Sequence, residues 1–219
     1  MPKSKRRGSS SEPSEPDQKS RLLDVATEVF LESGYEKAST TEIAVRARAS
    51  KQTLYSLYPS KEKLFLVIVA RLVDQIFRAF ETPFQREDSL RETLLNVGNN
   101  ALNILLTPRN LALVRIVYLE SRRFPEIRKS FYELGPGRAL KQIESYLAEQ
   151  KRQGTLHVAS AKLAAEQFLD LLVGGTILRN ALLDLEDYPL PSPAEQRRRA
   201  EATVDLFLHG CSTNSTTKG

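Results

Sequence analysis

Residues 39–63 read STTEIAVRARASKQTLYSLYPSKEK, and this segment gives the strongest indication of the fold. It predicts two short helices joined by a tight turn around residues 47–49. Ser39, followed three residues later by Glu42, has the pattern of a capping box, and Ser50 can cap the second helix. Isolated helices this short are marginal in water, so we expect both to be packed against a common core.

The second of these two helices has an apolar side and a polar side. Leu54, Leu57 and Tyr58 form the apolar side, and we expect Leu54 and Tyr58 to be core residues. The opposite side carries groups that can donate hydrogen bonds to phosphates and base edges: Lys51, Gln52, Thr53, Tyr55 and Ser56. A short helix with such a face suits the major groove of DNA, so the stretch predicts a helix-turn-helix.

The rest of the chain also has the pattern of helices. Leu22, Ala26, Val29 and Phe30 follow helical spacing, and Gly34 is expected to end that helix. Further helix starts are indicated by caps and first-turn prolines at Ser60, Ser89–Glu92, Thr107–Pro108, Phe124–Pro125, Ser160 and Ser192–Glu195. Because β-type alternation is missing, we predict an all-α fold of about nine or ten helices.

Composition excludes several classes of protein. The chain has 219 residues, a net charge of +5, one cysteine and two histidines, so we expect neither a disulfide nor a metal centre, and no cofactor. No apolar run approaches the roughly 20 residues of a membrane span, and the polar N-terminus does not resemble a signal peptide. The expectation is a cytoplasmic protein without a membrane partner.

Four regions are expected along the chain: a disordered basic tail (1–17), a helix-turn-helix domain (18–64), a larger helical domain (65–210) and a flexible tail (211–219). The first tail contains a basic cluster, Lys3, Lys5, Arg6 and Arg7. Such an arm can touch DNA phosphates, or it can be a solvated leader, and both readings stay open.

The first part of the chain resembles the TetR/AcrR family of bacterial repressors. The resemblance covers residues 22–66 and rests on matches at fixed spacing: Leu23, Ala26, Phe30, Gly34, Ser39–Ala44, Thr53–Tyr55 and Pro59–Leu64. It implies an N-terminal three-helix helix-turn-helix domain followed by a larger helical domain for ligand binding and dimerisation.

The resemblance also implies roles for individual residues. Thr40 and Thr41 would lie near the DNA backbone, Tyr55 would reach phosphate and base methyl groups, and Lys61 would contact phosphate from the start of the fourth helix. The complete candidate DNA-binding set is Thr40, Thr41, Ser50, Lys51, Gln52, Thr53, Tyr55, Ser56 and Lys61.

Three departures from the family pattern affect this interface. Arg48 stands where the family has a turn glycine, which costs about 1 kcal/mol if the backbone there is left-handed. Gln52 replaces a frequent glycine and brings a longer side chain near the bases. Leu57 stands where the family often has histidine and removes one possible phosphate donor. Together they make the operator sequence unpredictable.

The second part of the chain looks like the ligand-sensing half of the same family. Residues 115–137, RIVYLESRRFPEIRKSFYELGPG, resemble its AefR-like subgroup. In the family a small molecule enters a pocket among the central helices and moves the fourth helix. Candidate ligand-binding residues are Asn96, Asn100, Asn103, Tyr118 and Phe168. The alternative is that these asparagines face water and the aromatic residues are ordinary core.

A homodimer is expected to form through the last two helices. The candidate interface residues are Leu171, Gly175, Leu178, Leu182, Val204, Phe207 and Leu208, with intramolecular core as the rival explanation. The pair Gly174–Gly175 can allow close packing at the dimer interface, which we favour, or a kink beside a pocket. The basic run Arg197–Arg199 is interpreted as a solvated helix face.

These patterns predict a ligand-responsive DNA-binding transcriptional regulator. We expect a homodimeric repressor, with double-stranded DNA, a small-molecule effector and a second copy of itself as partners. A helical protein-interaction adaptor and an enzyme on a helical fold are the alternatives. The sequence contains no Gly-rich phosphate loop, G-x-S-x-G or H-E-x-x-H, so nothing in it nominates an enzyme.

Overall fold

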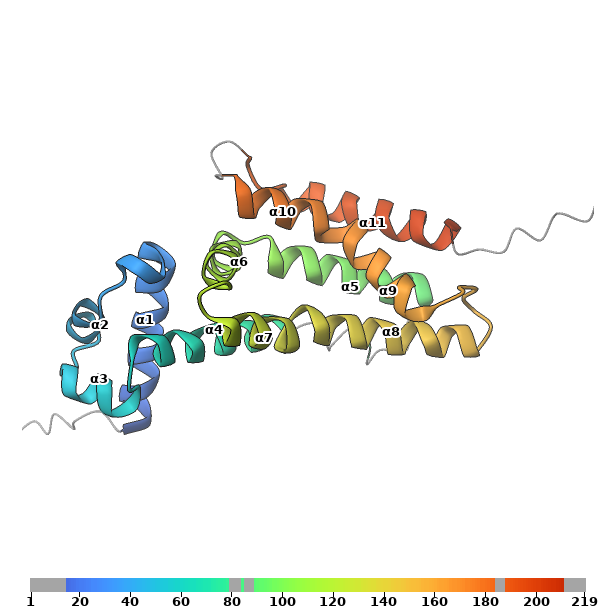
Figure 1. Cartoon of the computed structure of the whole chain (residues 1–219). Coiled ribbons are helices and arrows are strands. Elements are labelled where there is room, and N and C mark those ends of the chain that lie inside the picture. The colour runs from blue at the N-terminus through green and yellow to red at the C-terminus, as the bar shows by residue number, and fades with distance from the viewer. Residues whose placement is uncertain (1–14, 79–83, 85–88, 184–187, 211–219) are drawn as a thin grey trace, which may run out of the picture. The chain divides into compact units, whose positions relative to one another are not determined.

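The computed structural model describes residues 15–78, 84, 89–183 and 188–210. Within those residues the regular elements are helices, which confirms the predicted all-α class (Figure 1). The helices are α1 (Glu15–Lys37), α2 (Thr40–Arg46), α3 (Lys51–Leu57), α4 (Lys61–Arg78), α5 (Leu90–Leu105), α6 (Pro108–Glu120), α7 (Pro125–Leu134), α8 (Pro136–Arg152), α9 (Ala161–Leu169), a π-helical turn (Asp170–Gly174), α10 (Gly175–Leu182) and α11 (Pro193–Gly210).

The chain divides into two compact units, residues 1–68 and 69–219, which we call the first and the second unit. The division falls inside α4, four residues after the expected boundary at residue 64. The predicted first tail extends too far, because α1 already begins at Glu15. The rest of that tail and the predicted tail at 211–219 lie outside the described residues.

Serine caps begin the helices of the first unit where the sequence predicts them. The Ser39 side chain accepts from the Thr41 N–H at 3.3 Å and caps α2. Ser50 caps α3 by accepting from the Thr53 N–H at 2.9 Å. Each cap satisfies a backbone donor that the first helical turn leaves free, so both helix starts follow from local sequence.

The core of the first unit is an aromatic cluster of Phe30, Tyr35 and Phe65. The Phe65 ring centroid lies 5.0 Å from that of Phe30 and 4.9 Å from that of Tyr35. Leu54 of α3 is fully buried and Tyr58 is buried, as the sequence predicts for both. This filled core holds the two short helices that would not be stable alone.

Two positions of the first unit have a left-handed backbone. Arg48, in the turn between α2 and α3, has φ 52°. The backbone here is left-handed, so the strain expected for arginine in place of the family's turn glycine applies. Gly34 has φ 71° and ψ 174° and breaks α1. The expected helix end at Gly34 is only partly right, because the helical path resumes and continues to Lys37.

The second unit is built from helix pairs packed through apolar faces. α5 packs against α11, and α8 packs against α9. Phe168 of α9 and Phe207 of α11 meet edge to face, with ring centroids 5.3 Å apart. The junction of α7 and α8 requires Gly135, because an added Cβ would lie 2.6 Å from the Phe131 carbonyl oxygen and 2.9 Å from the Phe77 ring.

A π-helical turn interrupts the helical path that begins after the cap predicted at Ser160. The interruption covers Asp170–Gly174 and separates α9 from α10. Arg199 of α11 donates from Nε to the Leu172 carbonyl oxygen at 2.6 Å and from Nη2 to that of Leu171 at 3.1 Å. The solvated-face interpretation is therefore wrong for Arg199, which holds the widened turn in place.

Taken singly, none of the described helices combines the length and the apolar composition that a bilayer span needs. The pair α5 and α6, bent by 76° between its members, meets that test by length and composition only.

Candidate functional site

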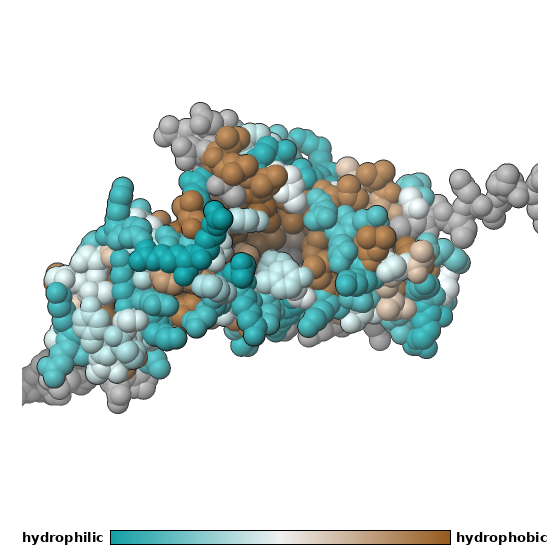
Figure 2. Space-filling model, viewed as in Figure 1, coloured by the Kyte–Doolittle hydropathy of each residue, from teal (hydrophilic) through white to brown (hydrophobic). Residues whose placement is uncertain are grey.

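The polar side of α3 faces away from the core of the first unit. Lys51, Gln52 and Ser56 are exposed, and Tyr55 is 43% exposed. Leu54, on the opposite side of the same helix, is fully buried. α3 therefore presents donor groups outward while its apolar side anchors it, and the visible surface of the first unit is mainly polar (Figure 2).

A hydrogen bond connects the two short helices at this face. The Thr40 and Tyr55 hydroxyl groups lie 3.0 Å apart, so Tyr55 is tied to the first turn of α2. Thr41, the next residue of that turn, is exposed. The contact places the Tyr55 hydroxyl beside the two threonines that the family resemblance assigns to the DNA backbone.

The small hydroxyl residues of α3 are partly used inside the protein. The Ser50 and Thr53 hydroxyl oxygens lie 2.8 Å apart, next to the backbone cap already described. The Ser56 hydroxyl donates to the Thr53 carbonyl oxygen at 2.8 Å. Their first role is thus to stabilise α3, and contact with DNA stays a prediction for all three.

Lys61 is held against the end of α1. Its Nζ donates to the Glu36 carbonyl oxygen at 3.1 Å and lies 4.6 Å from the centre of the Tyr35 ring. A phosphate contact by Lys61 stays a prediction, and it would compete with these two interactions or use the remaining N–H donors of the ammonium group.

Arg46 of α2 pairs with a carboxylate of α1 and with one of its own helix. The Arg46 guanidinium lies 2.8 Å from the Glu32 carboxylate and 3.4 Å from that of Glu42. The hydrogen bond from Arg46 lowers the pKa of Glu32 below its ordinary value. Glu42, expected to complete a capping box with Ser39, is engaged with Arg46 in the structure.

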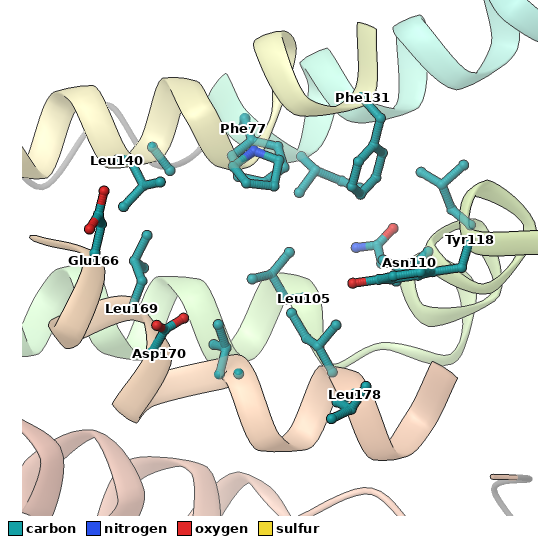
Figure 3. Close-up of a pocket in the computed structure, with 18 residues that line it drawn as sticks. Phe77, Leu105, Asn110, Tyr118, Phe131, Leu140, Glu166, Leu169, Asp170 and Leu178 are labelled. Carbon is teal, nitrogen blue, oxygen red and sulfur yellow. The ribbon is translucent and has the colours of Figure 1, made fainter. Parts of the chain in front are cut away.

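The second unit contains a cavity of about 470 Å³, within the size range of small-molecule sites (Figure 3). Helices α4 to α10 and the π-helical turn contribute to its walls. The lining residues are Ile76, Phe77, Leu105, Asn110, Leu113, Val114, Tyr118, Phe131, Pro136, Ala139, Leu140, Glu166, Leu169, Asp170, Val173, Gly174, Ile177 and Leu178. Most of them are apolar, so the cavity favours an organic molecule over an ion.

Polar groups lie at both ends of this cavity. Figure 3 shows Glu166 and Asp170 together at one end, and Tyr118 with Asn110 toward the other. The Asn110 side-chain amide donates to the Ile104 carbonyl oxygen, which leaves its own oxygen available. A bound molecule could thus be oriented by its two ends.

The structure places only one of the five predicted ligand-binding residues at the cavity. Tyr118 lines it, whereas Phe168 is 0% exposed and packs on Phe207. Leu105 is the residue of α5 that lines the cavity. Asn96 lies nine residues before Leu105, and a rotation of about 100° per residue places it on the opposite side of the helix. The remaining two predicted residues, Asn100 and Asn103, share the side of Asn96 and are not among the described residues that line the cavity.

The predicted dimer residues fall into exposed and buried groups. Leu182 is 75% exposed, and its surroundings on α10 form hydrophobic surface in Figure 2. Leu171, Gly175 and Leu178 are also exposed. Val204 and Phe207 are instead buried in the core of the second unit, with Leu208 half-buried, so the intramolecular alternative holds for Val204 and Phe207.

The sequence predicts neither most of the cavity nor the exposed leucine of α11. Phe77 of α4 lies far along the chain from Phe131 of α7 and Leu140 of α8, and no spacing connects it with them. A signal did exist in Glu166 and Asp170, two carboxylates four residues apart within an otherwise apolar stretch. That leucine is Leu206, which is 62% exposed beside the buried Phe207.

Two family models match the chain. Residues 22–68 match the model of bacterial regulatory proteins of the tetR family. Residues 92–210 match that of the AefR-like transcriptional repressor C-terminal domain, which covers more than half of the chain.

Curated relatives have the same assignment. The uncharacterised HTH-type transcriptional regulator YvkB of Bacillus subtilis (strain 168) is 24% identical over 194 residues, covering 89% of this chain and 97% of YvkB. The HTH-type transcriptional activator FasR of Mycolicibacterium smegmatis is 42% identical over 60 residues, 27% of either protein.

Solved structures extend the likeness to the whole fold. A putative TetR-family regulator from Mesorhizobium loti has a TM-score of 0.80 and 25% identity, covering 91% of this chain and 98% of that one. The flavonoid-responsive regulator FrrA has a TM-score of 0.70 and 27% identity, covering 90% of this chain and 98% of its own. The chain belongs to the TetR family of transcriptional regulators and carries the AefR-like form of the family's C-terminal domain.

Proposed function

We propose that this regulator binds a palindromic operator as a homodimer and releases it when a small molecule occupies the cavity of the second unit. The observation that carries the DNA-binding part is the outward polar face of α3 on a filled core. Lys51, Gln52 and Tyr55 are the residues we assign to bases and nearby phosphates. Thr40 and Thr41 would contact the backbone beside them.

Helix α4 is the element through which the cavity would act on DNA binding. It contributes Leu64 and Phe65 to the core of the first unit and Ile76 and Phe77 to the cavity wall. A ligand that fits only one position of Phe77 would favour one placement of α4. The ligand then shifts the population between a DNA-competent and a released state.

The proposed dimer uses the exposed leucines of the second unit. Leu171, Leu182 and Leu206 leave apolar surface in water that a second copy would cover. A two-fold dimer presents two recognition helices and therefore reads a two-fold operator. Val204 and Phe207 are omitted from this interface because the core of their own chain already buries them.

The effector is proposed to be a small organic molecule. The name of FrrA describes it as flavonoid-responsive, which supports an organic effector for a relative of similar fold. We propose repression because the C-terminal family model is that of a repressor, with activation as the variant suggested by FasR. Such a regulator acts in the bacterial cytoplasm, where its operator lies.

Selection of bound duplexes from a random pool tests the DNA-binding part. A recovered palindrome supports the proposal, and binding to it should fall steeply as salt rises, because lysine–phosphate contacts release counterions. An absence of salt-sensitive binding would favour the helical adaptor. The family is one of DNA-binding regulators rather than enzymes, so turnover of a ligand is not expected.

Substitution of Tyr55 tests the interface on the recovered operator. Tyr55→Ala should weaken operator binding by about 1–3 kcal/mol, the usual scale of a specific contact. Tyr132→Ala is the matched control, because Tyr132 is an exposed tyrosine of the second unit. Equal affinity of Tyr55→Ala and the wild type would remove Tyr55 from the interface.

Lys61→Ala tests the proposed phosphate contact separately. Binding should weaken about equally on all sequences, and the salt slope should fall by about 1. Because Lys61 also holds Glu36 and Tyr35, thermal unfolding of the variant must be measured in parallel. A changed base preference would contradict the phosphate role.

A further inference from the structure

The charged groups of the cavity are all of one sign. Glu166 and Asp170 are among the described residues that line it, and no lysine, arginine or histidine is. The two carboxylates lie one helical turn apart at the same end of the cavity (Figure 3). The wall therefore attracts positive charge and repels negative charge at this end.

Within the described parts of the chain, neither the Glu166 nor the Asp170 carboxylate has a hydrogen bond or an ion pair. The two differ in their surroundings. Glu166 also borders a neighbouring hollow that contains Lys141 and Lys162. Asp170 borders a third hollow whose lining residues include no basic side chain. Asp170 is therefore the stronger candidate for a cation.

Aromatic rings supply a second attraction for a cation in the same cavity. Phe77 and Phe131 lie along one wall, and the Tyr118 ring extends into the cavity toward Leu105 (Figure 3). Ring faces attract ammonium and other organic cations, and the attraction grows when water is excluded. The remaining wall is aliphatic and suits an apolar body.

We propose that the cavity selects organic cations: molecules with an apolar or aromatic body and a single positive group that lies beside Asp170 and Glu166. This inference deepens the proposed function, because it rests on the cavity being the effector site. Fatty acids and other organic anions are excluded as effectors by the same two carboxylates, since no basic side chain in the described lining would pair with them.

Matched probes of opposite charge test this selection on the full chain. One pair is compact and aromatic, tetraphenylphosphonium and tetraphenylborate. The other is linear, octyltrimethylammonium and octyl sulfate, with octanol as the neutral member. Titration calorimetry should show the cation of at least one pair binding about tenfold or more tightly than its anion, a difference of about 1.4 kcal/mol.

Charge-removing variants locate the preference. Asp170→Asn should weaken the preferred cation several-fold, and Asp170→Asn with Glu166→Gln should weaken it about tenfold, in keeping with partly exposed charge pairs. Affinity for octanol should be unchanged. Glu201→Gln, an exposed carboxylate of α11, is the matched control and should leave all affinities as in the wild type.

The outcomes separate this inference from the proposed function. Equal binding of both charges, a preference for the anions, no binding of any probe, or an unchanged cation affinity in the double variant overturns the cation selection. Operator binding and its release by the bound probe are measured on the same samples. A chain that binds its operator without cation preference remains a regulator, whereas a chain that binds no operator overturns the proposed function itself.

Discussion

The two units of this chain differ in what their helices enclose. In the first unit, Phe30 and Tyr35 of α1 and Phe65 of α4 form an aromatic cluster whose ring centroids lie 4.9 to 6.0 Å apart. In the second unit the helices leave a cavity of about 470 Å³ and include a π-helical turn. The core of the first unit is filled with side chains, whereas the second unit contains unfilled volume.

This difference matches what each unit has to do. A recognition helix of seven residues holds its side chains in position only if its buried side is tightly packed. A ligand site needs unfilled volume, and the atoms that line it give up contacts with other protein atoms. The second unit therefore has less packing to lose, which makes it the part that a bound molecule can stabilise.

The largest expected effect is on the filled core. Phe30→Ala should lower the free energy of unfolding by about 3–5 kcal/mol, measured by urea denaturation, because it empties a site with tightly packed neighbours. Phe131→Ala, a half-buried ring at the cavity, should cost less than half as much. Equal costs would remove the distinction between a filled and an open unit.

A smaller effect is expected at the π-helical turn. Arg199→Ala removes two charged hydrogen bonds to backbone carbonyls and should cost about 1–2 kcal/mol by thermal unfolding. Arg198→Ala, an exposed neighbour on the same helix, should stay within about 0.5 kcal/mol of the wild type. If both variants unfold alike, Arg199 does not hold the turn.

Relief of strain in the first unit should be of similar or smaller size. Arg48→Gly is expected to stabilise the chain by about 1 kcal/mol, because glycine accepts the left-handed backbone that arginine adopts at φ 52°. Lys51→Gly, at a helical position of α3, should instead destabilise it by about the same amount. A loss of stability in both variants would contradict the strain.

The smallest expected effect depends on pH. Because Arg46 lowers the pKa of Glu32, this pair stabilises the folded state above the ordinary carboxyl pKa and loses its effect as pH falls through the lowered value. The melting temperature of Glu32→Gln should lie slightly below that of the wild type near neutral pH and converge with it in acid. Glu201→Gln, outside the pair, should show no such convergence. A constant difference for Glu32→Gln across pH would assign the effect to something other than the ion pair.

Local rules account for what the sequence predicts well. The capping box of Ser89 and Glu92 and the cap by Ser50 depend on hydrogen bonds within three residues, so they can be read directly from spacing. The outward polar side of α3 follows from helical periodicity alone. The all-α class and the family resemblance rest on the same short-range patterns.

Long-range packing accounts for what was missed. Phe77 and Asp170 line one cavity although they lie far apart in the chain, and no periodicity links them. Phe207 and Leu206 differ by one position, a rotation of about 100°, yet one is buried and the other exposed. Composition alone does not tell which side of α11 faces the core. The helix was therefore predicted correctly, but two of the residues assigned to its dimer interface are buried in the core instead.

A π-helical turn takes up an additional residue without lengthening the elements on either side. Shortening Asp170–Gly174 by one residue would therefore let an ordinary helix run from α9 into α10 while Leu178 and Leu182 keep their directions, whereas a residue removed within α10 itself would rotate all that follows it by about 100°. This turn is thus the place where the chain can lose one residue of length with the cavity wall and the outer leucines left in register.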